Sequence, residues 1–118
     1  MSDTLAERLL RDRTLIVHLH HMDGIWPPLE VEARVDTGAD KSSIDELLAE
    51  ALGWDVVGEK TIKSANGRSV REYGTGPVTI EGIKFDMVTT YADRSSMSHP
   101  VLIGHDVLVD ILSISEEE

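Results

Sequence analysis

The residues best suited to chemistry in this sequence are Asp36-Thr37-Gly38-Ala39, which directly follow a segment of alternating apolar and polar residues. A carboxylate at the end of a strand, followed by a conformationally free glycine, can sit on a tight loop with backbone amides directed toward it. Aspartate, threonine and glycine are also common in ordinary turns. The motif alone therefore favours a structural turn over a catalytic loop.

A second group of candidate residues is the histidine cluster His18, His20 and His21. His18 and His20 share one face of an expected strand, where two imidazoles could bind a metal ion. Neither a cysteine nor an obvious fourth ligand lies nearby, and exposed imidazoles on a strand need no metal. We interpret the cluster as a solvated strand face and predict no metal site and no cofactor.

The charge balance limits the classes of partner. The chain has 118 residues, with 22 acidic residues against 11 basic ones and a formal net charge of −11. A surface that binds phosphates needs clustered lysine and arginine, so this balance argues against nucleic acid and against an anionic membrane. The chain has no cysteine, which excludes disulfides, thiolate zinc sites and cysteine nucleophiles. Any hydrolysis is left to the carboxylates.

Nothing in the sequence predicts export or membrane insertion. No apolar segment is long enough to span a bilayer. Residues Met1–Thr4 lack the basic region and apolar run of a signal peptide, so we expect a cytoplasmic protein. Aromatic residues make up only 4% of the chain against 41% hydrophobic residues in all, so the core must be aliphatic.

Two strands are expected before the aspartate. Residues 14–20 are rich in branched side chains, and residues 29–35 alternate apolar and polar side chains with a period of two. Asp23-Gly24 is a turn signal between them, so we predict an antiparallel pair that leads directly into Asp36. A short helix is expected in front of this pair, over residues 4–13.

A helix is expected after the aspartate, over residues 42–53. Ser43 and Glu46 fit a capping box at its start, and Gly53 fits its C-terminal end.

The rest of the chain predicts more strands. Asn66-Gly67 is typical of a type I′ turn and indicates a hairpin of residues 61–65 and 68–73. Further strands are expected over residues 78–80, 83–91 and 100–104, and a last helical turn or two over residues 107–112. We predict one mostly β domain over residues 1–118, with short helices and with residues 1–13 as a candidate N-terminal helical extension.

Three features, taken in order, resemble the retropepsin family of homodimeric aspartic proteases. They are Val35-Asp36-Thr37-Gly38-Ala39-Asp40, the hairpin from Ile62 to Tyr73, and Val101-Leu102-Ile103-Gly104-His105-Asp106-Val107-Leu108. The resemblance covers the chain from about Leu29 to Ile111. It implies a retropepsin-like acid-protease barrel with one Asp-Thr-Gly motif per chain.

The resemblance also implies a homodimer. An aspartic peptidase needs two carboxylates around one water, and this chain supplies one such motif. The site would form across a two-fold axis, with Asp36 from each subunit and a peptide or protein as substrate. Two carboxylates this close share one proton, so that the ionised member activates the water and the neutral member protonates the carbonyl oxygen.

The resemblance assigns the remaining roles residue by residue. Asp36, Thr37 and Gly38 would be catalytic, with the Thr37 hydroxyl bracing the opposite loop. The hairpin would be a flap that closes over the peptide. The substrate-binding residues would be Ala39, Asp40, Ser64, Ala65, Asn66 and Gly67.

This chain departs from the retroviral pattern at two places. His105 stands where the retroviral motif has arginine, opposite Asp40 by analogy, so a pair between them would depend on pH. The C-terminus ends in Glu116-Glu117-Glu118 rather than in an apolar dimer strand. A dimer could instead use residues 15–19 or 111–114.

The segment Asp93-Arg94-Ser95-Ser96-Met97 resembles a related branch more closely, the ATP-dependent zinc proteases that accompany ATP-grasp peptide ligases. Two alternatives therefore stand beside the aspartic peptidase. One is a metal-dependent peptide hydrolase of that type, and the other is a peptide-binding or dimerisation module without hydrolysis.

Four of the basic residues gather on the expected hairpin, namely Lys60, Lys63, Arg68 and Arg71. A charged hairpin that keeps the surface soluble is the simpler interpretation. The functional interpretation is a cationic lid that favours acidic peptides. We interpret Trp26 and Trp54 as packing residues rather than as binding platforms.

Overall fold

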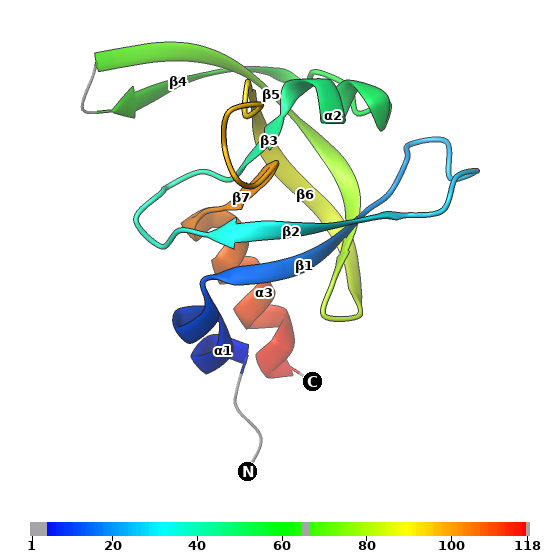
Figure 1. The fold of residues 1–118 in the computed structure, drawn as a ribbon, viewed down its shortest axis with the longest axis vertical. Coiled ribbons are helices and arrows are strands. Elements are labelled where there is room, and N and C mark those ends of the chain that lie inside the picture. The colour runs from blue at the N-terminus through cyan, green and yellow to red at the C-terminus, as the bar shows by residue number, and fades with distance from the viewer. Residues whose placement is uncertain (1–4, 65–66, 118) are drawn as a thin grey trace.

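The structure is a computed structural model that describes residues 5–64 and 67–117. Strands dominate these residues, with a helix near each end and one in between (Figure 1). In chain order the elements are α1 (Leu5–Asp12), β1 (Thr14–Leu19), β2 (Leu29–Val35), β3 (Ser43–Asp45), α2 (Glu46–Ala51), β4 (Gly58–Ser64), β5 (Gly67–Ile80), β6 (Ile83–Ala92), β7 (Val101–Ile103) and α3 (His105–Glu117).

The strands close into a barrel. They pair in the order β1-β2-β7-β3-β6-β5, and β5 pairs back with β1. Closure removes the open edges that a flat sheet would expose. Among the described strands, β4 pairs with β5 alone, so the β4–β5 hairpin projects from the barrel, at the upper left of Figure 1. The expected mostly β barrel with short helices is confirmed.

The first strand pair is antiparallel, as the turn signal Asp23-Gly24 predicted. Leu15, Val17 and Leu19 of β1 point into the core. In β2 only Ala33 and Val35 are fully buried, while Leu29 at its start is exposed, so the first half of β2 extends beyond the core.

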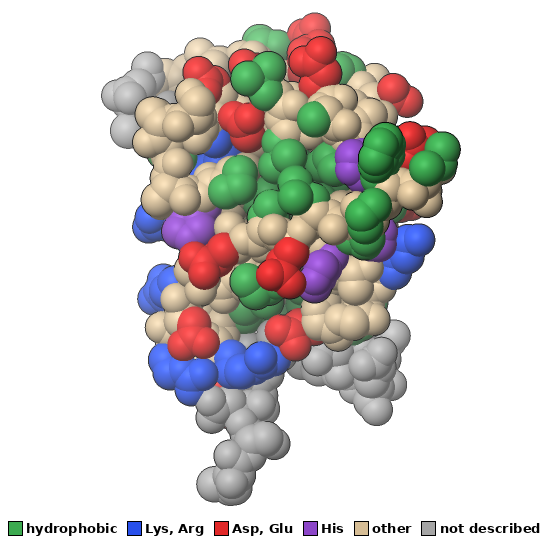
Figure 2. All heavy atoms as spheres, turned by 45° about the vertical axis from the view of Figure 1, so that its right-hand side comes forward, with side chains coloured by type: hydrophobic (Ala, Val, Ile, Leu, Met, Phe, Trp, Pro, Cys, Tyr) green, Lys and Arg blue, Asp and Glu red, His purple; other side chains and the backbone are tan. Residues whose placement is uncertain are grey.

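The core is largely aliphatic, and Trp54 packs within it as predicted. Trp26 is not part of this core: the residue is 62% exposed on the loop between β1 and β2, where its ring centre lies 6.2 Å from that of His21. Met22 and Ile25 on the same loop are also exposed. Figure 2 shows exposed hydrophobic side chains gathered on one face of the molecule, with acidic and histidine side chains around them.

The segment after the aspartate differs from its prediction. Residues 43–45 form strand β3, which pairs parallel with β6 and antiparallel with β7, and the helix begins only at Glu46. The N-cap is Asp45, whose Oδ2 accepts a hydrogen bond of 3.3 Å from the Leu48 amide. The backbone of Ser43 and Ile44 fills the gap between two strands distant in sequence, and this outweighs the local capping signal. The end of the helix is as predicted, since Gly53 follows it with φ of +75°.

Strand β5 is continuous where the pattern predicted two strands. Its register with β6 runs unbroken from Tyr73 to Ile80, because Gly74 and Gly76 let the strand pass close to other groups. At its start, Gly67 is paired with Ser64 rather than lying in the turn. The predicted turn residue Asn66, and Ala65, lie outside the described residues.

The terminal helices flank one end of the barrel (Figure 1). Helix α1 matches its prediction, whereas α3 begins two residues earlier than expected, at His105, and runs to Glu117. Among residues 5–64 and 67–117, no helix combines the length and apolar character needed to cross a bilayer.

We predict that Gly76→Ala lowers the free energy of unfolding by about 3 kcal/mol, because overpacking forces a buried neighbour to move. A Cβ at this position would overlap the indole ring of Trp54, which is itself buried. Chemical denaturation at fixed protein concentration measures the change. Thr75→Ala, one residue away on the same strand, is the control and should cost much less. Equal stability of Gly76→Ala and the native chain would contradict the packing described.

Candidate active site

Asp36 begins a short loop at the end of strand β2. Its amide donates a hydrogen bond of 2.9 Å to the carbonyl of Ile103, so the loop starts against β7. Its Oδ1 accepts a bond of 3.0 Å from the Gly38 amide, and its carbonyl accepts one of 3.2 Å from Ala39. The carboxylate thus closes an Asx-type turn while its side chain stays half-buried. A turn and an accessible carboxylate are both present in the same four residues.

Ser42 anchors the far end of this loop. Its side chain is fully buried, and its amide and hydroxyl both donate to Oδ1 of Asp106, at 3.0 and 2.8 Å. Its hydroxyl oxygen accepts a 2.8 Å bond from the Gly104 amide. Its carbonyl accepts a 3.0 Å bond from the Thr90 amide. One serine therefore ties the loop to β6, to the end of β7 and to the start of α3.

Gly104 permits this close approach. A Cβ on Gly104 would lie 2.7 Å from the carbonyl carbon and oxygen of Lys41 and 2.9 Å from the carbonyl oxygen of Ala39. Real side chains essentially never approach backbone atoms this closely. The next residue, His105, donates its amide to the same Ala39 carbonyl at 2.7 Å. The apolar-apolar-glycine pattern at the end of β7 is thus explained by contact with the aspartate loop.

A groove of about 450 Å³ separates the aspartate loop from the β4–β5 hairpin. The loop side contributes Gly38, Ala39, Asp40, Lys41 and Ser43, and the hairpin side contributes residues 60–63 and Arg71. Thr90, Leu102 and Arg94 complete the lining.

The groove brings together some of the predicted site residues. Gly38, Ala39 and Asp40 line it, directly after Asp36 and the exposed Thr37 in the chain. Gly67 is described at the start of β5 and does not line the groove. Ser64 is described only as the last residue of β4, while Ala65 and Asn66 lie outside the described part of the chain.

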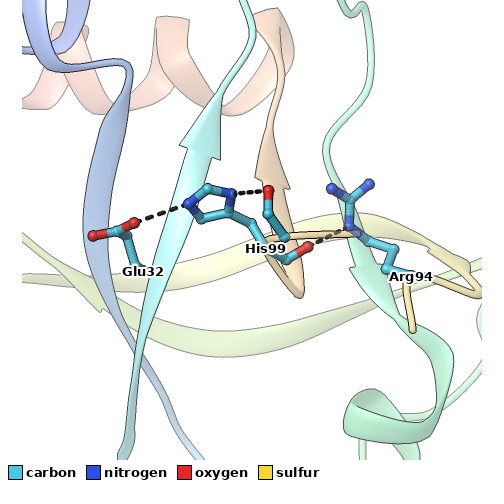
Figure 3. A network of polar contacts seen from close by, with 4 residues as sticks. Glu32, Arg94 and His99 are labelled. Carbon is cyan, nitrogen blue, oxygen red and sulfur yellow. Dashed lines mark hydrogen bonds and ion pairs between the residues drawn. The ribbon is translucent and has the colours of Figure 1, made fainter. Parts of the chain in front are cut away.

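Arg94 is a groove residue to which sequence reasoning gave no role. Its Nε donates to the His99 carbonyl at 3.0 Å, and its Nη1 donates to the Ser43 hydroxyl at 3.2 Å. His99 in turn contacts Oε1 of Glu32 through Nε2 at 2.9 Å (Figure 3). Burial lowers the pKa of Arg94, against the opposing effect of the nearby Asp45 carboxylate. No local pattern marks this arginine, because it reaches the groove only through the pairing of β3 with β6 and β7.

The other candidate side chains have separate surroundings. His18 contacts Oε1 of Glu30 at 3.2 Å, and His20 contacts the Thr79 hydroxyl at 2.7 Å. Burial lowers the pKa of His20. Within the described ranges no three potential ligands cluster as a metal site would require.

The pair predicted by analogy between Asp40 and His105 is not formed in this chain. Both residues are exposed, and no hydrogen bond or ion pair joins them in the part of the chain that the structure describes. His105 instead contacts the loop through its backbone. Asp106, at the start of α3, accepts a 2.8 Å bond from the Val107 amide, and its Oδ1 also accepts from Ser42.

The barrel carries a half-exposed aspartate on a clamped loop, and the residues that follow this aspartate face a projecting hairpin across a groove. The sequence matches the family described as "gag-polyprotein putative aspartyl protease" over residues 28–110. The chain belongs to this family, and its fold is that of the retropepsin-like aspartic proteases. No curated protein sequence matches the chain significantly.

Solved structures support the same fold. The EIAV protease complexed with the inhibitor HBY-793 superposes with a TM-score of 0.62 at 20% identity, covering 83% of this chain and 86% of that one. A protein of unknown function from Legionella pneumophila (Lpg0085, DUF785) gives 0.57 at 15% identity, covering 84% and 85%. The foamy viral protease-reverse transcriptase gives 0.56 at 20% identity, with 77% of this chain covering 10% of that longer one.

We predict that Ser42→Ala costs about 2 kcal/mol of stability, because it leaves the Gly104 amide without its acceptor and removes a donor from the Asp106 carboxylate. Denaturant unfolding measures this cost, and exchange of the Gly104 amide hydrogen measures the local loosening. Ser113→Ala on the exposed part of α3 is the matched control. Unchanged stability and unchanged exchange at Gly104 would show that Ser42 does not hold the loop.

Proposed function

We propose that this chain is an aspartic peptidase that acts as a homodimer, with Asp36 of each subunit holding one shared water. The observation that carries the proposal is the Asp36 loop itself. It is held by buried hydrogen bonds through Ser42, yet its carboxylate is half-exposed, and the groove lining begins two residues further along the loop, at Gly38. Membership in the aspartyl protease family supports the same chemistry.

The dimer follows from the number of carboxylates. The sequence holds a single Asp-Thr-Gly, and two carboxylates are needed to activate one water and protonate one carbonyl. The exposed Thr37 is the next residue along the loop, and in the described chain its hydroxyl makes no hydrogen bond. In the proposed dimer this hydroxyl braces the partner's loop across the two-fold axis.

The mechanism uses only carboxylates and water. The two Asp36 side chains share one proton, because like charges this close do not both ionise. The ionised carboxylate takes a proton from the water as its oxygen attacks the peptide carbonyl carbon. The protonated carboxylate gives its proton to the carbonyl oxygen, which forms a neutral gem-diol. Return of a proton to the amide nitrogen then breaks the C–N bond and releases an acid and an amine.

The groove and the hairpin supply the substrate site in this proposal. An extended peptide would lie between the loop residues Gly38 to Asp40 and strand β4. Within the described strands β4 pairs only with β5, so its other edge is free for backbone hydrogen bonds. The β4–β5 hairpin would act as a flap that closes over the peptide and excludes water, with Ser64, Ala65, Asn66 and Gly67 at its tip.

We predict that Asp36→Asn lowers kcat by about a thousandfold and leaves the dimer folded, because an amide can neither take the proton from water nor give one back. The native chain should be most active at acidic pH, where one carboxylate of the pair is protonated and the other is not. Hydrolysis of a fluorogenic peptide library between pH 3 and pH 8 measures both effects.

Asp110→Asn on the exposed face of α3 is the matched control and should keep full activity. Activity that survives Asp36→Asn would contradict the proposal. Activity that chelators abolish and a statine inhibitor does not would instead indicate a metal-dependent hydrolase. Peptide binding with no turnover by the native chain would indicate a binding module.

A further inference from the structure

The groove carries a charge opposite to that of the chain as a whole. Acidic residues outnumber basic ones by 22 to 11 in the sequence. In the groove lining the ratio is reversed, because Lys41, Lys60, Lys63, Arg71 and Arg94 face a single acid, Asp40. Nearly half of the basic residues of an acidic chain therefore meet at the proposed substrate site. A solubilising surface does not require this concentration, since acidic side chains serve that purpose elsewhere on the molecule.

The hairpin places two of these cations directly opposite each other. Lys60 on β4 and Arg71 on β5 are cross-strand partners in the antiparallel register. Like charges in directly opposite positions repel each other. The Lys60 ammonium group is held 4.5 Å from the centre of the Tyr73 ring, which fixes its position without neutralising its charge. Neither cation has an ion pair among the described residues, so the repulsion persists until an anion lies between them.

Arg94 is a second cationic point on the opposite side of the groove. The groove arginine is half-buried, and its donors Nε and Nη1 are bonded to the neutral acceptors His99 and Ser43. In Figure 3 its two terminal nitrogens point away from His99. Among the ion pairs of the described residues there is none between Arg94 and the nearby Asp45, whose two oxygens accept the backbone amides of Arg94 and Leu48. Burying a guanidinium without a carboxylate partner costs free energy. A carboxylate of a ligand could supply that partner by forming a bidentate pair with Arg94.

We propose that the groove selects extended peptides with acidic side chains close to the bond that is cut. One carboxylate binds the terminal nitrogens of Arg94, and a second lies between Lys60 and Arg71. This inference rests on the proposed function, because it names the substrate class of the same site. It also changes which residues make up the cationic site that the sequence suggested on the hairpin. Arg68 does not line the groove, whereas Lys41 and Arg94 add charge from the barrel side.

A peptide fits this site better than other anions do. The open edge of β4 offers backbone hydrogen bonds that an extended peptide can use and a phosphate chain cannot. The net charge of −11 repels long polyanions, so binding depends on short-range contacts inside the groove.

The test uses Asp36→Asn protein, so that binding is measured whether or not the chain is catalytic. Two fluorescein-labelled octapeptides are compared by anisotropy, one containing glutamates and the other with glutamine at the same positions. We expect the glutamate peptide to bind about tenfold more tightly, which corresponds to one charge-assisted pair retained. Equal affinities of the two peptides would overturn the inference, and so would polyphosphate that competes as well as the glutamate peptide does.

Groove variants locate the preference. In the Asp36→Asn protein, Arg94→Gln should remove most of the preference for the glutamate peptide. Arg94→Lys should keep part of this preference, because lysine retains the charge without the planar fork. Arg94 also bonds to Ser43 and His99, so Lys60→Gln with Arg71→Gln provides a second variant on the exposed hairpin that leaves those contacts intact. Lys84→Gln on β6 removes one positive charge outside the groove and should leave the preference unchanged. A preference that persists in both groove variants would overturn the assignment.

Turnover by the native chain separates this inference from the proposed function. Tight binding of the glutamate peptide without hydrolysis would uphold the acidic groove and contradict the peptidase. Hydrolysis of the glutamine peptide with an equal or higher kcat/KM would uphold the peptidase and overturn the acidic preference.

Discussion

The site depends on one close approach, that of the aspartate loop to the end of strand β7. No Cβ fits at Gly104, and the space that glycine leaves is occupied by the backbone of Ala39 and Lys41. The buried hydroxyl of Ser42 fastens the two segments by accepting from Gly104 and donating to Asp106. In the proposed dimer, a carboxylate that shares a water with its counterpart needs this precision, because small displacements weaken catalysis strongly. The barrel makes this contact possible, because it brings β2, β7 and β3 side by side.

Much of the fold could be predicted from local patterns in the chain. Branched side chains over 14–20 and alternation over 29–35 identified β1 and β2, because one face of each meets the core. The order of Asp-Thr-Gly, hairpin and apolar-apolar-glycine identified the family, which the match over residues 28–110 confirms. The failures share a cause. The local sequence of β3 predicts a helix, because the partners that make it a strand, β6 and β7, lie far away in sequence. The sequence of β5 predicts an interruption at its glycines, whose role is to make room for Trp54 and Tyr91.

The candidate site was predictable in its loop and not in its surroundings. Residues 36–40 are contiguous, so their spacing carries the signal directly. Arg94 belongs to no local pattern, and its position at the groove follows from a network through Ser43, His99 and Glu32 that only the folded chain assembles. The pair predicted between Asp40 and His105 fails for a related reason. The aspartate loop accepts a hydrogen bond from the backbone amide of His105. The link between this loop and the start of α3, which an ion pair was expected to make, is made by the hydrogen bond between Ser42 and Asp106.

The central claim is that one active site needs Asp36 from two subunits. Mixing subunits tests it most directly, by refolding native chains together with equal amounts of Asp36→Asn chains. If both aspartates are required, only dimers of two native chains are active, and random pairing leaves about one quarter of the activity of the native protein at the same total concentration. A remaining activity of about one half would mean that each subunit works alone, and it would contradict the account.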